Sequence, residues 1–111
     1  MTVFFIDPGR FRAPLALDVA DLEPDGAGGL TGGWTETASF YGRVEPVAAG
    51  PRFAGDQFLE DTTHRITIRH RADVKAGMRL RKAGRHFAIL SVHDPDESGR
   101  YLVCLAREEQ L

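Results

Sequence analysis

The sequence has little cysteine, little methionine and no long apolar run. Its 111 residues include one cysteine, two methionines and one tryptophan. The single cysteine, Cys104, excludes an intramolecular disulfide and a cysteine-based zinc site. No stretch approaches the roughly 18 consecutive apolar residues of a membrane helix. Residues 1–8 lack the basic and apolar segments of a signal peptide, so we expect a soluble, non-exported chain with no membrane partner.

Net charge is also low. The 14 Lys and Arg residues against 16 Asp and Glu give −2, which excludes a strongly basic nucleic-acid binder by bulk charge. The charges are unevenly distributed, however. Residues 64–86 carry eight basic side chains and one acidic one, whereas residues 1–63 carry four basic and ten acidic ones. One short segment therefore holds most of the positive charge.

Glycine and proline, with 12 and 6 residues, favour turns and short strands over long helices. This length supports a single domain, residues 1–111. We predict an all-β fold of five to six mostly antiparallel strands, a small barrel or sandwich with long loops and at most a short helix. Apolar alternation and β-branched or aromatic content place the strands at residues 13–18, 34–47, 63–71, 78–81, 86–92 and 101–106.

Glycine and proline also mark the irregular points of these strands. Gly42 is expected to bend strand 34–47, and Pro46 to end it. Residues 23–33 contain five glycines and predict a mobile hairpin loop. A phosphate-binding loop would need Lys-Ser/Thr after the glycines, but Trp34-Thr35-Glu36 follows them, so we reject that interpretation.

A basic strand face is the strongest electrostatic feature. In strand 63–71, His64, Ile66, Ile68 and His70 alternate with Arg65, Thr67, Arg69 and Arg71, and Arg79 and Arg81 follow on the next strand. We expect the arginines to share one face. That face could be solvated, contact phosphates, or pair with acidic residues of 1–63 on an adjacent copy, and the opposite charges within one sequence favour pairing. Replacing Arg69 and Arg79 together by Glu should then abolish assembly and leave a folded monomer. The residues of this face are Arg65, Arg69, Arg71, Arg79 and Arg81.

The sequence shows no pattern of an active or metal site. His64 and His70 lie about 20 Å apart on one extended strand, so they cannot share an ion within one chain. Cys104 falls in an apolar strand, where a thiolate is disfavoured. Carboxylate pairs such as Asp94 with Asp96 lie in turns, where they serve hydrogen bonding and solubility. We therefore predict no catalytic residue, no metal, no cofactor and no enzyme activity.

Several segments, taken in order, resemble the phage head-tail joining family, also called head-tail adaptor, connector or stopper proteins. The resemblance runs from about Phe11 to Glu108, so that residues 1–10 are an N-terminal extension beyond the usual start of the family. The Thr-His-Arg-Ile-Thr-Ile-Arg strand after a Val-Glu-Pro is its most specific part. The segments are Asp25–Gly29 followed by Trp34, Tyr41–Pro46, Thr63–Arg71, Met78–Leu80 and Gly84–Ile89.

The resemblance implies a small β-barrel that assembles as a homo-oligomeric ring, a hexamer or dodecamer, in the neck of a tailed phage, prophage or gene transfer agent particle. The ring would lie beneath the portal-adaptor ring and above the tail terminator, and would be assembled in the bacterial cytoplasm. It would act as a stopper that retains packaged double-stranded DNA and docks the tail. We expect a monomer in isolation, because the chain is small.

Family members carry a long loop after the Glu-Pro that projects toward the channel. The matching stretch here is residues 47–60, which contains large apolar residues without strand or helix periodicity. The resemblance implies that this loop contacts the channel or a neighbouring subunit. Its candidate residues are Arg52, Phe53, Asp56, Phe58 and Leu59.

A second function class stays open from the residues alone. The arginine face, with Trp34, Phe40 or Tyr41 as stacking platforms, could make the chain a small-barrel nucleic-acid-binding module. Steep salt dependence of DNA binding would favour this alternative.

Overall fold

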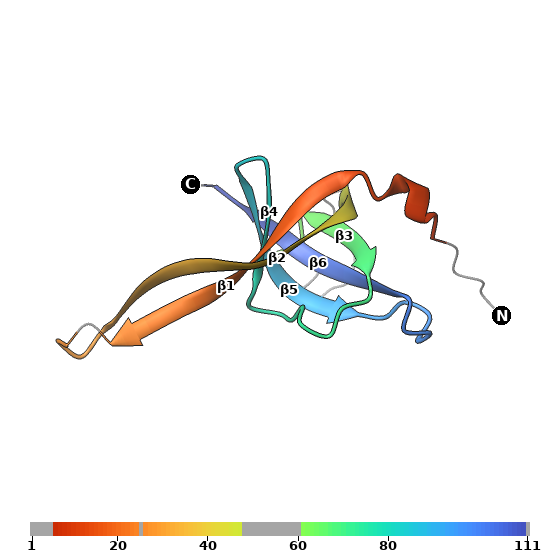
Figure 1. The fold of residues 1–111 in the computed structure, drawn as a ribbon. Helices are drawn as coiled ribbons and strands as arrows, with labels where there is room; N and C mark the ends of the chain where they lie inside the picture. The colour runs from red at the N-terminus through yellow and green to blue at the C-terminus, as the bar shows by residue number, and fades with distance from the viewer. Residues whose placement is uncertain (1–5, 25, 48–60, 111) are drawn as a thin grey trace.

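In the computed structural model, the described residues 6–24, 26–47 and 61–110 form a closed six-stranded antiparallel β-barrel (Figure 1). The order around the barrel is β1-β2-β3-β6-β5-β4. This confirms the predicted all-β barrel with at most a short helix. The elements are a 3-10 turn, Pro8–Arg10, and the strands β1 Ala13–Pro24, β2 Leu30–Pro46, β3 His64–Arg69, β4 Arg79–Lys82, β5 Arg85–His93 and β6 Tyr101–Glu109.

The core is the inside of the barrel, filled by alternate residues of the strands. Leu15 and Leu17 of β1, and Ile66 and Ile68 of β3, point inward as their alternation predicts. Phe87 is the largest fully buried side chain. Burial of these apolar side chains is the main stabilising contribution. The whole cluster is Leu15, Leu17, Ile66, Ile68, Val74, Leu80, Phe87, Ile89, Leu102, Cys104 and Ala106.

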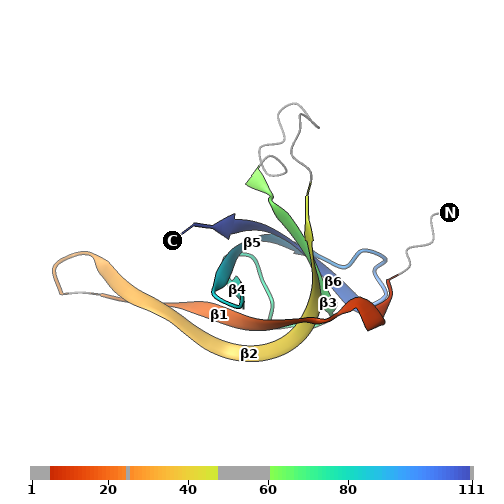
Figure 2. The ribbon, with the colours of Figure 1, turned by 90° about the horizontal axis from the view of Figure 1, so that it is seen from above.

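Strand β2 bends sharply, so that it pairs with β1 along its first part and with β3 along its last (Figure 2). Gly42 lies at the change of partner and is buried. A Cβ there would come within 2.8 Å of the Leu15 side chain and 2.9 Å of the Thr67 carbonyl oxygen. Only glycine fits this approach, and β2 ends at Pro46, so both predictions for this strand are confirmed.

The hairpin β1–β2 extends beyond the barrel as a two-stranded arm (Figures 1 and 2). β4 pairs with β1 only at residues 16–18, whereas the β1–β2 ladder continues to Pro24 and Leu30. The prediction of a loop over 23–33 was therefore too long, because Gly32 and Gly33 belong to β2. Gly32 is opposite Leu22, where a Cβ would overlap the Asp21 carbonyl oxygen. Gly32 and Gly33 are therefore part of a strand, and the missing side chain of Gly32 allows β1 and β2 to approach closely.

A β-bulge marks the point where the arm leaves the barrel. The β1–β2 register shifts between Leu17 and Asp18, so that Thr37 has no partner residue on β1. The Thr37 hydroxyl donates to the Leu17 carbonyl at 3.4 Å. A bulge of this kind increases local strand twist. The bulge therefore helps to set the direction of the arm.

The predicted hairpin of residues 78–81 and 86–92 is confirmed as β4–β5. Its tight turn places Ala83 at φ 48° and Gly84 at φ 83°, the pair of positive angles that a type I′ turn needs. Strand β6 pairs with both β3 and β5, which confirms the central position expected for an apolar strand. No helix within the described residues is long and apolar enough to cross a membrane.

Candidate functional site

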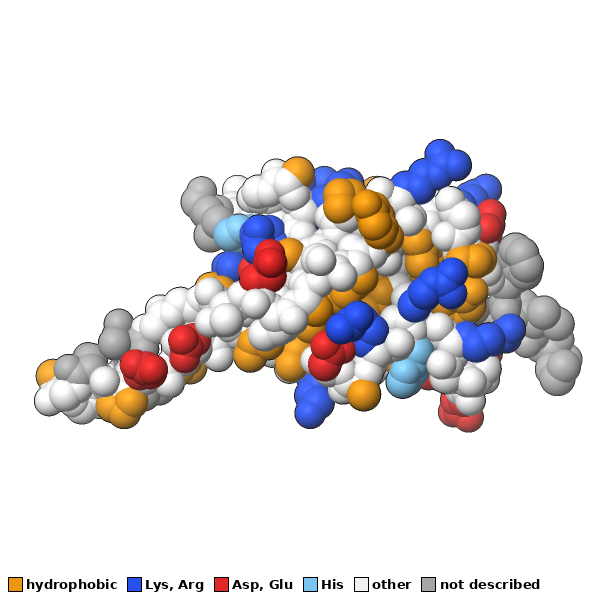
Figure 3. Space-filling model, in the orientation of Figure 1, with side chains coloured by type: hydrophobic (Ala, Val, Ile, Leu, Met, Phe, Trp, Pro, Cys, Tyr) orange, Lys and Arg blue, Asp and Glu red, His pale blue; other side chains and the backbone are white. Residues whose placement is uncertain are grey.

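The five candidate arginines do not share one face. Arg65 and Arg69 are on β3 and Arg71 follows it, whereas Arg79 and Arg81 are on β4. Two strands separate β3 from β4 in either direction around the barrel. In Figure 3 the blue and red side chains are interspersed rather than gathered by sign. The predicted single basic face is therefore wrong, because alternation sets the face of each strand while barrel closure sets where each strand lies.

Arg79 and Arg81 converge on a buried carboxylate, Asp18, which is 2% exposed. Arg79 donates to Asp18 Oδ2 from Nη2 at 2.8 Å and from Nε at 3.1 Å. Arg81 donates to Asp18 from Nε at 3.2 Å and from Nη2 at 3.3 Å. Arg81 also donates to Glu36 at 2.6 Å, and the Arg79 guanidinium lies 4.4 Å from the centre of the Trp34 ring. This cluster ties β4 to β1 and β2 at the base of the arm.

The charge on Asp18 is maintained by these two arginines. Burial alone would raise the pKa of the Asp18 carboxyl, but the hydrogen bonds and positive charges of Arg81 and Arg79 outweigh it, and the pKa lies below its ordinary value. Asp18 is therefore an ionised buried group that needs both partners. Glu replacement of Arg79, proposed above as a test that spares the fold, would instead place two carboxylates together in this cluster.

The arginines on the β3 side also have partners within the chain, with one exception. Arg65 donates to Glu45 at 3.2 Å, and Arg71 binds both carboxylate oxygens of Asp73 at 3.0 Å. Arg69 is exposed and makes no ion pair with the described residues. Three of the acidic residues of 1–63 that we expected to meet a neighbouring copy, Asp18, Glu36 and Glu45, are thus already paired with these arginines inside one chain. A role of these arginines between subunits stays a prediction.

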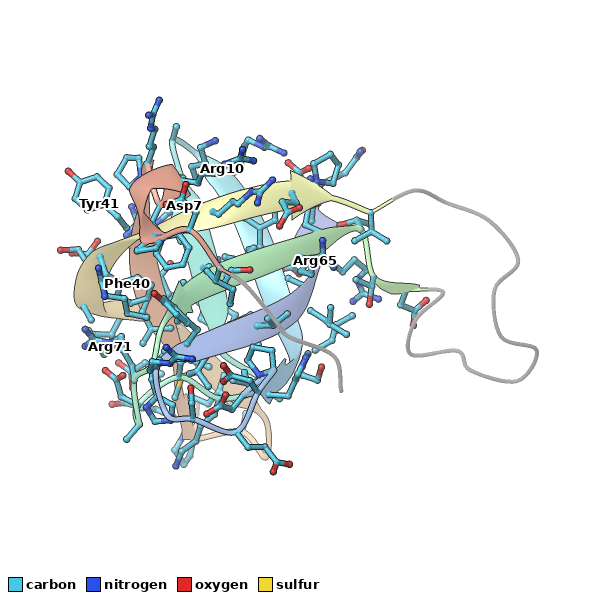
Figure 4. The ribbon with its side chains drawn as sticks, turned by 90° about the vertical axis from the view of Figure 1, so that its right-hand side faces the viewer. Asp7, Arg10, Phe40, Tyr41, Arg65 and Arg71 are labelled. Atoms are coloured by element: carbon cyan, nitrogen blue, oxygen red, sulfur yellow. The ribbon has the colours of Figure 1, made fainter. Side chains whose placement is uncertain are left out.

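A groove brings together Arg69 and Arg71 with aromatic side chains from separate elements (Figure 4). Its volume is about 390 Å³. The Arg71 guanidinium lies 5.0 Å from the centre of the Phe40 ring, and Tyr41 is 63% exposed at the rim. The groove is lined by Pro8, Phe11, Phe40, Tyr41, Arg69 and Arg71.

Two of the groove residues, Pro8 and Phe11, were missed in the sequence, where residues 1–10 were treated as an extension apart from the barrel. Phe11 packs edge-on against Tyr101, with ring centres 5.7 Å apart. The one available signal was an aromatic residue directly before the first strand. Trp34, the third predicted stacking residue, does not reach the groove, because it lies on the arm against Arg79.

The predicted loop residues cannot be compared with the structure. Arg52, Phe53, Asp56, Phe58 and Leu59 lie outside the described residues. The residues on either side of this segment are adjacent: Pro46 is paired with His64, and the Val47 N–H donates to the Thr63 carbonyl at 2.9 Å.

The residues with catalytic potential serve packing in this fold. Cys104 is fully buried, and burial raises the pKa of its thiol to about 12. The Thr63 hydroxyl lies 2.9 Å from His64 Nδ1, but it also accepts the Glu108 N–H at 2.7 Å and so joins strand ends. Within residues 6–24, 26–47 and 61–110, no three His, Cys, Asp or Glu side chains form a group that could hold a metal ion.

Comparison with known proteins assigns the chain to a family. The family model "phage head completion protein" matches residues 6–109. The chain belongs to this family. The match confirms the resemblance to head-tail joining proteins that the sequence motifs carry. No curated protein matches this head completion protein.

Two solved structures share its fold. One is a chain from the virion of a native gene transfer agent particle, with 26% sequence identity and a TM-score of 0.69; the match covers 92% of this chain and 96% of that one. The other is the solution structure of protein SF1141 from Shigella flexneri 2a, with 24% identity and a TM-score of 0.70; the match covers 93% of this chain and 96% of that one. The second likeness concerns the fold alone.

Proposed function

We propose that this head completion protein is a structural component of the neck of a phage or phage-like particle. It forms a homo-oligomeric ring beneath the portal-adaptor ring, retains packaged DNA and offers a docking surface to the tail. The observation that carries the proposal is the family match over residues 6–109, supported by the likeness to a chain of a gene transfer agent virion. A hexamer or dodecamer would suit this position.

The shape of the chain supports a ring of this kind. Rings are built from heterologous contacts, in which one surface of a subunit meets a different surface of its neighbour. The arm and the barrel offer two such different surfaces, because the arm projects from one side of the barrel (Figure 1). The role is structural rather than enzymatic.

We further propose that residues 47–60 face the channel or a neighbouring subunit. The paired positions of Pro46 and His64 support this proposal, because they make the segment an insertion at one point of the barrel. Replacing residues 48–60 by a short Gly-Ser linker should leave the barrel folded by circular dichroism and reduce DNA retention in particles. Full retention of DNA by a particle containing this variant would contradict the assignment.

Electron microscopy of particles from a producing strain tests the main proposal. Deletion of the gene should give DNA-poor or leaking heads beside separate, complete tails, and the wild-type gene supplied in trans should restore joined particles. Intact tailed particles from the deletion strain would refute the proposal.

The alternative, a nucleic-acid-binding module, retains one supporting observation. The groove places Phe40 and Tyr41 beside Arg69, a combination of stacking surface and cation. The position of Arg79 and Arg81 on β4, on the opposite side of the barrel, weakens this alternative. Binding of the purified chain to DNA that falls steeply with salt would favour this alternative, and no binding at low salt would eliminate it.

A further inference from the structure

The arm has one apolar face that its own barrel leaves largely exposed, although the Arg79 guanidinium lies over the Trp34 ring. Ala20 is opposite Trp34 in the β1–β2 register, and Leu22 lies two residues further along β1, so the three side chains share a face. Asp21 and Glu23 lie on the other face. Leu22 is 62% exposed and Trp34 is 42% exposed. The arm is thus amphipathic although it has no core of its own.

Such an arm has little intrinsic stability. A two-stranded hairpin without a third strand or a packed face is marginal in water. Beyond residue 18 of β1 the arm gains no pairing from β4. An apolar face on a projecting, marginally stable hairpin indicates a partner that orders it.

The groove offers matching chemistry. Only three large apolar side chains are exposed in the described part of the chain: Leu22 and Trp34 on the arm, and Tyr41 at the groove. The groove is also lined by Pro8, Phe11 and Phe40, so an aliphatic side chain would find apolar contacts on several sides.

Charge complementarity points in the same direction. Residues 19–35 contain three acidic and no basic residues. Among the described residues, Asp21 and Glu23 make no ion pair, and neither does Arg69 in the groove. Figure 3 shows red but no blue side chains on the outer part of the arm. An acidic arm and a groove with a free guanidinium attract each other.

The arm cannot reach the groove of its own chain. Tyr41 is opposite Pro14, and eight residues of extended strand separate Pro14 from Leu22, about 26 Å at 3.3 Å per residue. The arm projects to the left in Figure 1, away from the barrel, whereas Phe40 and Tyr41 lie on the part of β2 that is paired with Leu15 and Pro14 within the barrel. Only the groove of another molecule is accessible to this arm.

We propose that the arm of one copy docks in the groove of the next copy, with Leu22 as the apolar anchor and with the acidic charge of Asp21 and Glu23 attracted by Arg69. This contact is heterologous, so repetition around a closed circle gives a ring. The inference rests on the proposed ring function and names the surfaces that build the ring.

Site-directed crosslinking within particles tests this contact. The double variant Leu22→Cys/Tyr41→Cys replaces the wild-type gene, and purified particles are treated with a short bis-maleimide reagent. Linked arms and grooves give a ladder of dimers, trimers and larger species on a denaturing gel. The control is Leu22→Cys/Arg107→Cys, which should give no ladder because Arg107 is exposed but far from the groove. Arg107 lies on β6 six residues, or about 20 Å, from Tyr101, which is paired with Arg69 of the groove. Cys104 is buried and does not compete.

Incorporation of variants gives a second readout. Leu22→Asp should lower the number of copies per particle at least about tenfold, as expected for loss of an anchor residue. Arg69→Glu should lower it as well, and the additional changes Asp21→Lys and Glu23→Lys should restore it. Circular dichroism of each purified variant should match the wild type, because all four positions are exposed.

The outcomes separate this inference from the proposed function. If the wild-type chain is present in particles but the Leu22/Tyr41 pair gives no ladder and Leu22→Asp is incorporated normally, the arm–groove contact is refuted and the neck role stands. One crosslinked product with a different neck protein would refute a second copy as the occupant. If the wild-type chain is absent from particles, both the neck role and this contact fail.

Discussion

Asp18 is the residue at which a conservative change should have the largest effect on stability. Asp18→Asn keeps the shape of the side chain but removes its charge. Its amide nitrogen replaces one of the two oxygens that together accept four guanidinium hydrogen bonds, and this nitrogen accepts none. Removing one partner of a buried ion pair costs about 3–5 kcal/mol. We expect the lower end, about 3 kcal/mol, because Arg81 is 37% exposed and keeps Glu36.

Equilibrium urea denaturation and thermal melting followed by circular dichroism measure this loss. At roughly 4 °C per kcal/mol for a domain of this size, the melting temperature should fall by about 12 °C. The matched control is Glu36→Gln, which removes the other carboxylate of the same cluster. Glu36 is 55% exposed, so its pair with Arg81 should contribute less than about 1 kcal/mol. Equal losses of stability in Asp18→Asn and Glu36→Gln would refute the argument that burial makes the Asp18 ion pairs the stronger ones.

The contribution of Asp18 to stability should also depend on pH. The pKa of Asp18 is lower in the folded chain than in the unfolded one, so its stabilising contribution is complete above the unfolded value near 3.9 and is lost as the pH falls through the folded value. Wild type and Asp18→Asn should differ by a constant amount from about pH 5 to 8 and converge below about pH 4. A difference that stays constant into strong acid would show that the amide, rather than the lost charge, causes the destabilisation.

Two further predictions concern the barrel. Gly42→Ala should destabilise the fold by about 1–3 kcal/mol in urea denaturation, because the new methyl group meets Leu15 and the Thr67 carbonyl. The control Gly33→Ala, with no atom near its added Cβ, should be neutral or slightly stabilising. Equal effects of the two changes would contradict the close approach at Gly42. Cys104 should not react with a thiol reagent at pH 8 in the native chain and should react once the chain is unfolded, because burial raises its pKa to about 12; rapid labelling of the folded protein would contradict this burial.

Local sequence patterns predicted the strands well. The alternation around Ile66 and Ile68, the bend at Gly42 and the turn at Ala83-Gly84 each depend on residues close in the sequence, and each is present in the structure. Thr67 is an exception, because it shares the outward face with Arg65 but is 5% exposed. It lines a small hollow together with Ile6 and Val103, so part of the barrel's outer face is covered.

The candidate site depended on non-local geometry and was less predictable. Nothing in the alternation of Arg79 and Arg81 shows that their strand closes the barrel against β1, where Asp18 lies 61 residues away from Arg79. The groove likewise combines Phe11, Phe40 and Arg69 from three elements. The glycines of residues 26–33 looked like a loop because close strand approach and loop formation favour the same residue.

With the proposed arm–groove contact, Asp18 would also link the stability of the barrel to the geometry of assembly. A single strand, β1, carries Leu22 toward one end and Pro14, the partner of Tyr41, toward the other. Between them lie the bulge at Thr37 and the Asp18 cluster, which ties the base of the arm to β4. In a ring built by arm–groove contacts, the angle between arm and barrel sets the rotation from one copy to the next, and closure requires that this rotation divide a full circle. In such a ring, the buried ion cluster would therefore lie where a small change in strand direction alters the number of copies.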